Sequence, residues 1–232
     1  MVARRVYRWM LGMIHICWCE FTLLLLERFG LYHYSHIIPG RTSARSLSQF
    51  QALYKLHFDT FQVPNISGFY HGIMRDLWED YGLGQKGLLI SESTRTRQAF
   101  SEVYPQTVFI CTDYYVDLQS CAQTDVLWDI CSPEIPRILQ HGFDSIVCQA
   151  TMEHVWAPDV AMKNLCGLLN VQGRFYLHTH APCFPYHAWP RDYLRYWPDW
   201  FVDLEHHIPG MHLLELLCVA GHVFAVYEKE HV

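Results

Sequence analysis

Acidic and imidazole side chains follow two apolar runs of the sequence. Phe143 to Ala150 (FDSIVCQA) is followed by Glu153 and His154, and a second run carries His178 and His180. An imidazole titrates near neutral pH, so a histidine at a binding edge can accept a proton from a bound molecule. The residue types at these positions therefore indicate proton-transfer chemistry.

The same histidines permit a metal site. His178 and His180 alternate on one predicted strand, and His187 follows nearby in the sequence. A metal centre of this kind needs a further carboxylate or cysteine ligand at a fixed spacing, and the sequence offers no clear one. The fifteen histidines are otherwise spread along the chain and match no structural-zinc spacing. We therefore predict that the chain holds no metal.

Two buried strands joined by a helix position these side chains. The pattern predicts a strand at Ser145–Ala150, a helix at Val160–Leu169, a turn at Gly173 and a strand at Arg174–Thr179. Strands connected through a helix are parallel, and the sheet is covered by helices. Ligands bind at the carboxyl ends of the strands in such sheets, which is where the acidic and imidazole side chains stand.

Alternating elements extend this unit in both directions and predict a doubly wound α/β sheet. Two further helices precede the first strand, at Leu47–Phe58 and Gly72–Asp80, and two apolar runs close the chain as a hairpin. The remaining predicted elements are a strand at Leu88–Ser91, a helix at Thr96–Val103, strands at Thr107–Thr112 and Val126–Asp129, and the hairpin strands His212–Cys218 and His222–Glu228.

We divide the chain into an apolar helix with a linker (1–45) and a catalytic-type domain (46–232), with a helical cap at 46–85 and an insertion at 180–201. Residues 6–26 are largely apolar, with Arg4 and Arg5 before them, which is typical of a membrane contact. Glu20 would cost roughly 2.5 kcal/mol or more in mid-bilayer, so a helix packed on the domain is the alternative to membrane contact.

The charge of the chain argues against a nucleic-acid partner, and its cysteine content indicates reduced thiols. The net charge is −6 with only 17 basic residues, which leaves no electrostatic footprint for nucleic acid. The nine cysteines are odd in number and several fall inside predicted strands or helices, where a reduced thiol packs well. We predict a cytoplasmic protein with reduced cysteines, whose residues 6–26 are the place for any membrane association.

The block from FDSIVCQA through Met152-Glu153-His154-Val155 to Gln172-Gly173-Arg174-Phe175-Tyr176-Leu177 resembles the second half of a class I S-adenosylmethionine-dependent methyltransferase. In the small-molecule and glycan-modifying kind, a strand ending in EHV precedes a helix, a glycine turn and a strand. Residues 185–196 (PYHAWPRDYLRY) resemble the YHxxPxDYxR insertion of one branch of that family. The resemblance covers about residues 86–228. It implies a seven-stranded, mostly parallel sheet with an antiparallel last strand, and S-adenosylmethionine as the cofactor.

The carboxyl ends of the strands offer residues for the nucleoside. Asp113 closes the second strand, where an acidic residue accepts hydrogen bonds from ribose hydroxyls. Asp129 resembles the residue of the family that meets the adenine amino group, with Ile130 against the ring. An Asp that only opens a turn is the alternative for both. The full predicted cofactor set is Ser91, Glu92, Ser93, Asp113, Tyr114, Asp129, Ile130, Gln149 and Glu153.

The loop after the first strand departs from the family. Its members carry a GxGxG run there, because glycine lets the backbone approach the cofactor and adopt unusual dihedral angles. This chain reads SESTRTR, with no glycine. The loop either binds the cofactor through hydroxyls along a modified path or does not bind it. Arg95 could pair with the cofactor's carboxylate or fill the pocket, and Ser93 or Thr94 could simply cap the next helix.

The insertion at 180–201 is dense in aromatic and polar residues, a composition that suits a sugar-like acceptor. We predict His154 and His187 as catalytic, with Tyr186, Asp192, Tyr193 and Arg195 on the acceptor side. The alternative for His154 is helix capping and packing, and a local salt bridge on a short helix is the alternative for Asp192 and Arg195.

These features predict methyl transfer from S-adenosylmethionine to a small polar or glycan-like acceptor. The leading rival is a catalytically inactive protein of the same fold that acts by binding, because SESTRTR lacks the cofactor glycines. A nucleotide-dependent dehydrogenase is a third hypothesis, which the missing glycine fingerprint and the terminal hairpin disfavour.

Overall fold

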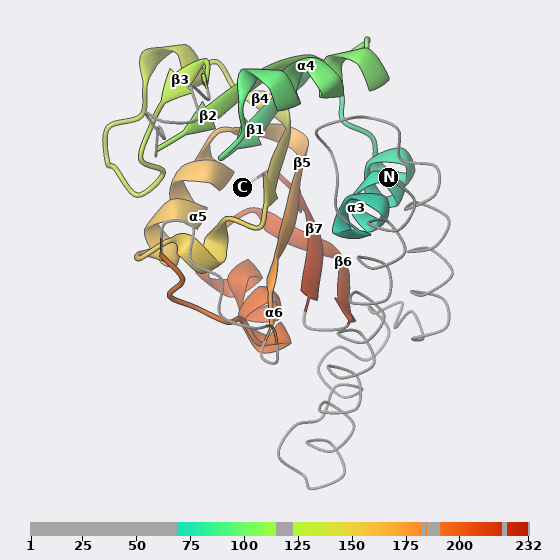
Figure 1. Ribbon diagram of the computed structural model, residues 1–232. Helices are drawn as coiled ribbons and strands as arrows, with labels where there is room; N and C mark the ends of the chain where they lie inside the picture. Colours follow the sequence, from blue (N-terminus) through green and yellow to red (C-terminus); the bar gives the residue numbers. More distant parts are fainter. Residues whose placement is uncertain (1–68, 115–122, 182–183, 185–190, 220–221, 232) are drawn as a thin grey trace, which may run out of the picture.

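The protein is described by a computed structural model, which covers residues 69–114, 123–181, 184, 191–219 and 222–231 (Figure 1). Seven strands form one sheet in the order β3-β2-β1-β4-β5-β7-β6. The five strands from β3 to β5 are parallel, and β7 runs antiparallel to both β5 and β6. This is the predicted doubly wound sheet with its antiparallel terminal strand. The strands are β1 Lys86–Ile90, β2 Val108–Asp113, β3 Val126–Leu127, β4 Phe143–Gln149, β5 Leu169–His180, β6 Met211–Val219 and β7 His222–Lys229.

Helices cover both faces of the sheet (Figure 1). The helix α3 (Phe69–Tyr81) packs on β5 and β7, and α4 (Thr94–Val103) packs on β2. The opposite face carries α5 (Pro158–Gly167) and α6 (Pro198–His207), which share a core with Ile146, Leu177 and Ala225. Short 3₁₀ turns, η2 (Arg137–Leu139) and η3 (Met152–His154), follow β3 and β4. One apolar core therefore packs on each face of the sheet. The carboxyl ends of its central strands remain as the place for a site.

The predicted βαβ unit is present, but its turn differs from the prediction. Strand β5 begins at Leu169, ahead of the predicted Arg174, and its register with β4 shifts beyond Phe143. Gln172, not Gly173, has the left-handed backbone conformation, at φ 65°. A Cβ atom at Gly173 would stand 2.8 Å from the Asn170 carbonyl oxygen. The glycine is required for close approach of two backbone segments and not for a turn.

The helix predicted at Gly72–Asp80 and the terminal hairpin are confirmed as α3 and the β6–β7 pair. The described side chains of α3 pack on the sheet, where Met74, Leu77 and Trp78 are buried with Tyr176 and Phe224. The apolar segment 6–26, the linker and the predicted helix Leu47–Phe58 lie outside the described residues. Among the described helices, none is long and apolar enough to cross a bilayer.

Five cysteines fall in the described part of the chain, and all five are free thiols. Three of them, Cys111, Cys148 and Cys166, are buried in the sheet or in α5. Burial raises the pKa of Cys166 to about 12, so this thiol stays protonated and packs as a small apolar side chain. The predicted packing is observed at Cys111, Cys148 and Cys166, whereas Cys131 and Cys218 are half-buried.

Candidate nucleoside and methyl-transfer site

A cavity of about 540 Å³ opens at the carboxyl ends of β1, β2, β3 and β4. It lies where the strand order reverses between β1 and β4, which is the usual ligand crevice of a doubly wound sheet. A volume of this size is typical of small-molecule sites. Its lining residues are Ser91, Thr112, Asp113, Tyr114, Trp128, Asp129, Ile130, Cys131, Gln149, Ala150, Thr151, His154, Val155, Trp156, Ala157 and Tyr193.

Eight of the predicted site residues are in this lining, brought together from four strand ends and two loops. They are Ser91, Asp113, Tyr114, Asp129, Ile130, Gln149, His154 and Tyr193. The predicted cofactor residues Glu92, Ser93 and Glu153 and the predicted acceptor residues Asp192 and Arg195 are not part of it. Tyr186 and His187 lie outside the described residues.

Two non-glycine residues at the mouth of the crevice have left-handed backbone conformations. Ser91 follows β1 with φ 56°, and Ala150 follows β4 with φ 45°. A left-handed conformation costs a residue other than glycine roughly 1–2 kcal/mol. Such conformations persist where the surrounding structure enforces them, and they cluster at functional sites. The loop without glycine therefore keeps the positive φ that a glycine would supply easily.

The loop after β1 leads into α4 without blocking the cavity. Ser93 is the N-cap of α4, and its Oγ accepts a hydrogen bond from the Thr96 backbone N–H at 3.2 Å. Arg95 is exposed and is not among the lining residues, so it does not fill the crevice. Burial, with the nearby Asp113 carboxylate adding to it, raises the pKa of Glu92 to about 7. The loop therefore carries an acid that is largely protonated below neutral pH.

The two acidic residues predicted for the nucleoside stand at the ends of β2 and β3. Asp113 ends β2 and lines the cavity. Asp129 also lines it, but its Oδ1 accepts a hydrogen bond from the Cys131 backbone N–H at 2.9 Å. That contact is the local turn weighed as the alternative, and it holds the carboxylate in place at the wall. Both residues line the cavity, and a carboxylate oxygen can accept hydrogen bonds.

Two buried polar atoms in the lining have no hydrogen-bond partner among the described residues, and the sequence did not single them out. The Thr112 hydroxyl, on a residue with no exposed surface, and the Trp128 indole N–H, on a residue 4% exposed, are both unsatisfied. An unsatisfied buried polar group costs about 1–3 kcal/mol. Both residues line the cavity, so a polar ligand there is a candidate partner for these groups.

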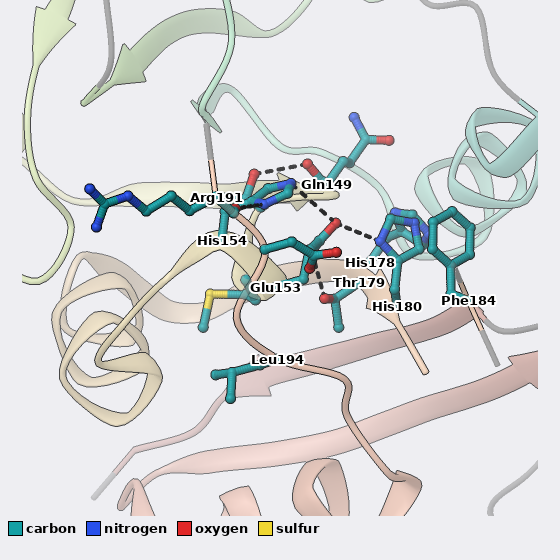
Figure 2. Close-up of polar contacts among 12 residues, drawn as sticks. Gln149, Glu153, His154, His178, Thr179, His180, Phe184, Arg191 and Leu194 are labelled. Atoms are coloured by element: carbon teal, nitrogen blue, oxygen red, sulfur yellow. Dashed lines mark hydrogen bonds and ion pairs between the residues drawn. The ribbon is translucent and has the colours of Figure 1, made fainter. Parts of the chain in front are cut away.

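Glu153 and His154 follow β4 in the turn η3, and their side chains take different surroundings (Figure 2). Glu153 is fully buried and accepts a hydrogen bond from the Thr179 hydroxyl at 2.7 Å. Its Oε1 lies 2.6 Å from His180 Nδ1 and 3.8 Å from His154 Nε2. The carboxylate therefore points into the protein toward β5 rather than into the cavity.

His154 lines the cavity and is oriented from both sides (Figure 2). Its Nδ1 lies 2.5 Å from the Arg191 carbonyl oxygen, which can only accept a hydrogen bond. The proton of the neutral imidazole is therefore on Nδ1, and Nε2 is left as the basic nitrogen. The Glu153 carboxylate beside Nε2 would stabilise the imidazolium that forms when Nε2 takes a proton.

The insertion contributes Tyr193 to an aromatic wall and holds a partly buried ion pair. Tyr193 and the 79% exposed Trp156 line the cavity with their rings in an edge-to-face contact, 5.4 Å between centroids. Arg195 binds both oxygens of Asp192 at 2.5 Å. The predicted salt bridge therefore forms, but residues 191–197 are not a helix. The backbone N–H groups of Tyr193 and Leu194 donate to the Glu153 carbonyl oxygen, which ties this segment to η3.

No protein-family model and no curated protein matches this sequence. Similar solved structures exist. A 1,6-didemethyltoxoflavin-N1-methyltransferase of Burkholderia thailandensis, solved with S-adenosylhomocysteine, is 14% identical with a TM-score of 0.53 over 79% of this chain and 87% of its own. A protein of Bacillus halodurans named as a methyltransferase is 12% identical, with a TM-score of 0.52 over 68% of this chain and 99% of its own.

The [4+2]-cyclase SpnF is similar to the same degree, at 12% identity and a TM-score of 0.51 over 72% of this chain and 85% of its own. A cyclase among these neighbours illustrates that one fold can carry different reactions. At this level of identity the likenesses show architecture alone. The described part of the chain has the class I S-adenosylmethionine-dependent methyltransferase fold.

Proposed function

We propose that the chain transfers a methyl group from S-adenosylmethionine to a small polar or glycan-like acceptor. The observation that carries the proposal is the crevice at the β1–β4 switch point, where the unsatisfied Thr112 hydroxyl and Trp128 N–H stand beside Asp113 and Asp129. Hydrogen-bond donors and acceptors gathered in one cavity at this position suit a nucleoside.

The residues of the wall take separate parts of the cofactor. Asp113 would accept from the ribose hydroxyls, with Tyr114 beside it, and Asp129 would accept from the adenine amino group over Ile130. Ser91, Glu92 and Ser93 of the entry loop would face the amino-acid tail, with Gln149 across the crevice at the end of β4. S-adenosylmethionine supplies a sulfonium whose methyl group is open to in-line attack, and the protein's part is to position it.

His154 would act as the general base for a hydroxyl or amine acceptor. As the acceptor atom bonds to the methyl carbon, the carbon–sulfur bond breaks and the acceptor's proton passes to His154 Nε2. The Arg191 carbonyl oxygen holds the ring in the productive tautomer, and the Glu153 carboxylate 3.8 Å away offsets the new positive charge. Base catalysis of this kind contributes about 10²–10⁴-fold to rate.

The acceptor would lie against Trp156 and Tyr193, whose rings offer apolar faces beside polar edges. Tyr186 and His187 precede Tyr193 in sequence and remain proposed acceptor-side residues, with His187 as a second catalytic candidate. The ion pair of Asp192 with Arg195 is mostly buried, so its proposed role is to hold the Tyr193 segment in place.

Isothermal titration with S-adenosylmethionine and S-adenosylhomocysteine tests cofactor binding. The native chain should bind both, and Asp113→Asn should weaken binding by about 10-fold, which is 1.4 kcal/mol. Asp199→Asn, at an exposed position on α6, is the matched control and should bind normally. Ligand at about a hundred times its dissociation constant should also stabilise the native chain by roughly 2.7 kcal/mol. Absence of binding by the native chain would refute the proposal.

A catalytically inactive binding protein is the second candidate, favoured by the serines that stand where the family has glycines. It predicts cofactor or product binding without transfer of a labelled methyl group to any member of an acceptor panel. His154→Ala separates the two functions. In an enzyme it should lower the transfer rate while leaving cofactor affinity unchanged, whereas an inactive protein has no rate to lose.

A further inference from the structure

Three buried imidazoles gather at the ends of two neighbouring strands. His178 and His180 lie on β5 and His222 begins β7, and their exposed fractions are 0%, 3% and 1%. His180 is paired directly with His222 across the antiparallel ladder, and His178 is two residues from His180. Alternate residues of a strand and directly opposed residues share one face of the sheet, so all three rings lie on the same face.

The ring nitrogens are close enough to bind a common ion. One nitrogen from each ring lies within 4.8 Å of those of the other two, and His178 Nε2 is 2.9 Å from His222 Nδ1. A tetrahedral ion with metal–nitrogen bonds of about 2.0–2.1 Å separates its ligand nitrogens by about 3.3–3.4 Å. The observed distances bracket that value, so small side-chain rotations would bring the three nitrogens to it.

The Glu153 carboxylate contacts the His180 ring (Figure 2). Glu153 Oε1 lies 2.6 Å from His180 Nδ1, and the Thr179 hydroxyl donates to Oε2 at 2.7 Å. An ionised Glu153 places the proton of His180 on Nδ1, which leaves the Nε2 lone pair for a ligand bond. Metal-binding histidines almost always donate their other N–H to a carboxylate, carbonyl or water in this way. Phe184 stacks on the His180 ring, 3.6 Å between centroids, and further restrains it.

We propose that His178, His180 and His222 bind one divalent transition-metal ion of the zinc class, with Glu153 positioning His180. Three neutral imidazoles and one carboxylate carry a single negative charge, which partly balances a buried divalent cation. The sequence led to the opposite expectation because no carboxylate or cysteine stands at a fixed spacing from the β5 histidines, and His222 is remote from them along the chain. Hydrogen bonding among buried imidazoles without any ion is the alternative that the experiment must separate.

The site would cross-link β5 to β7 beside the proposed methyl-transfer centre. Glu153 Oε1 contacts His180 on one side and approaches His154 Nε2 on the other, so a single carboxylate connects the ion's ligand to the proposed base. The proposal itself does not depend on methyl transfer. Metal binding is measured directly, so its failure and the failure of the proposed function are distinguishable.

The test is metal binding by the full chain after treatment with a chelator. The native chain should take up one equivalent of Zn²⁺, and with Co²⁺ it should show visible absorption bands typical of a four-coordinate ion with three nitrogen ligands. His178→Gln and His222→Asn each keep a buried hydrogen-bonding group but remove an imidazole, and each should lose this binding. Glu153→Gln should weaken it by about 10–100-fold. His141→Gln, at an exposed position, is the control and should bind as the native chain does.

Two results would overturn the proposal. One is a native chain that binds no more Zn²⁺ than the His178→Gln and His222→Asn variants. The other is a Co²⁺ complex with strong thiolate-to-metal absorption, which would assign the ion to cysteines. The Co²⁺ spectrum and the number of ions bound are both measured on the native chain. The proposal can therefore still be tested if a variant fails to fold.

Discussion

The unsatisfied hydroxyl of Thr112 gives the most discriminating prediction, because one substitution should move two measured quantities in opposite directions. Thr112 lies on β2 with no exposed surface, and its Oγ1 has no hydrogen-bond partner in the part of the chain that the structure describes. Thr112→Val replaces the hydroxyl with a methyl group of similar size and keeps a β-branched residue in the strand.

The magnitudes follow from the burial of the group. An unsatisfied buried hydroxyl costs about 1–3 kcal/mol, so removing it should raise the free energy of unfolding of the ligand-free chain by about 1–2 kcal/mol. For a chain of this size each kcal/mol corresponds to a melting-temperature change of about 2–4 °C. If the hydroxyl binds the nucleoside, its loss should weaken S-adenosylhomocysteine binding by about 10-fold, or 1.4 kcal/mol.

Chemical denaturation of the ligand-free chain and isothermal titration with S-adenosylhomocysteine measure the two effects. Ser145→Ala is the matched control, because Ser145 is also fully buried with an unsatisfied hydroxyl but does not line the cavity. It should leave ligand affinity unchanged. The hydroxyl does not bind the ligand if Thr112→Val destabilises the ligand-free chain. The same conclusion follows if S-adenosylhomocysteine affinity falls equally in Thr112→Val and Ser145→Ala.

Three further changes test the entry loop and the aromatic wall. The pKa of Glu92 is raised from 4.5 to about 7, so the fold retains this proton longer than the unfolded chain. This proton contributes about 1 kcal/mol to the free energy of unfolding, after allowance for partial exposure. The contribution is complete below pH 4.5 and is lost as the pH rises to 7. Glu92→Gln should abolish that decline in denaturation at pH 5 and pH 8. Ser91→Gly should change unfolding free energy by less than about 1 kcal/mol, since relief of the left-handed conformation is offset by glycine's entropy, whereas Ser91→Val should destabilise clearly in the same assay. Trp156→Ala should leave stability within about 0.5 kcal/mol and raise the acceptor KM without changing S-adenosylhomocysteine affinity, and an unchanged KM would remove Trp156 from the acceptor site.

The sheet could be predicted because its strands are short apolar runs that end at polar residues. Such patterns depend only on local sequence, and β1, β2, β4, β7 and α4 begin or end within a few residues of their predicted positions. The start of β5 could not be predicted in this way. The sequence around Gly173 predicts a turn residue. The glycine is instead needed because a Cβ atom at this position would stand too close to the Asn170 carbonyl oxygen. A Cβ atom at Gly173 would also stand 3.0 Å from the Phe143 carbonyl oxygen on β4, and this tertiary contact is not revealed by the sequence around the glycine.

The site was predictable only where strand ends determine it. Asp113 ends β2 and Asp129 follows β3, and both line the cavity for that reason. Thr112 is a typical strand residue, and whether its hydroxyl finds a partner depends on the neighbours that the fold brings to it. His222 joins His178 and His180 only through the antiparallel pairing of β7 with β5, which no spacing in the sequence encodes.

The absence of glycine after β1 bears on how closely a cofactor approaches, not on whether the crevice forms. Ile90 of β1 is paired with Cys148 of β4. The backbone is left-handed at Ser91, one residue after Ile90, and at Ala150, two residues after Cys148. These two strained residues directly follow adjacent parallel strands and line the cavity, and they have the backbone conformation that glycine adopts readily. What serine adds at this position is a Cβ and a hydroxyl in the cavity wall. A cofactor tail held there would therefore meet a hydroxyl where the glycine-containing loops present bare backbone.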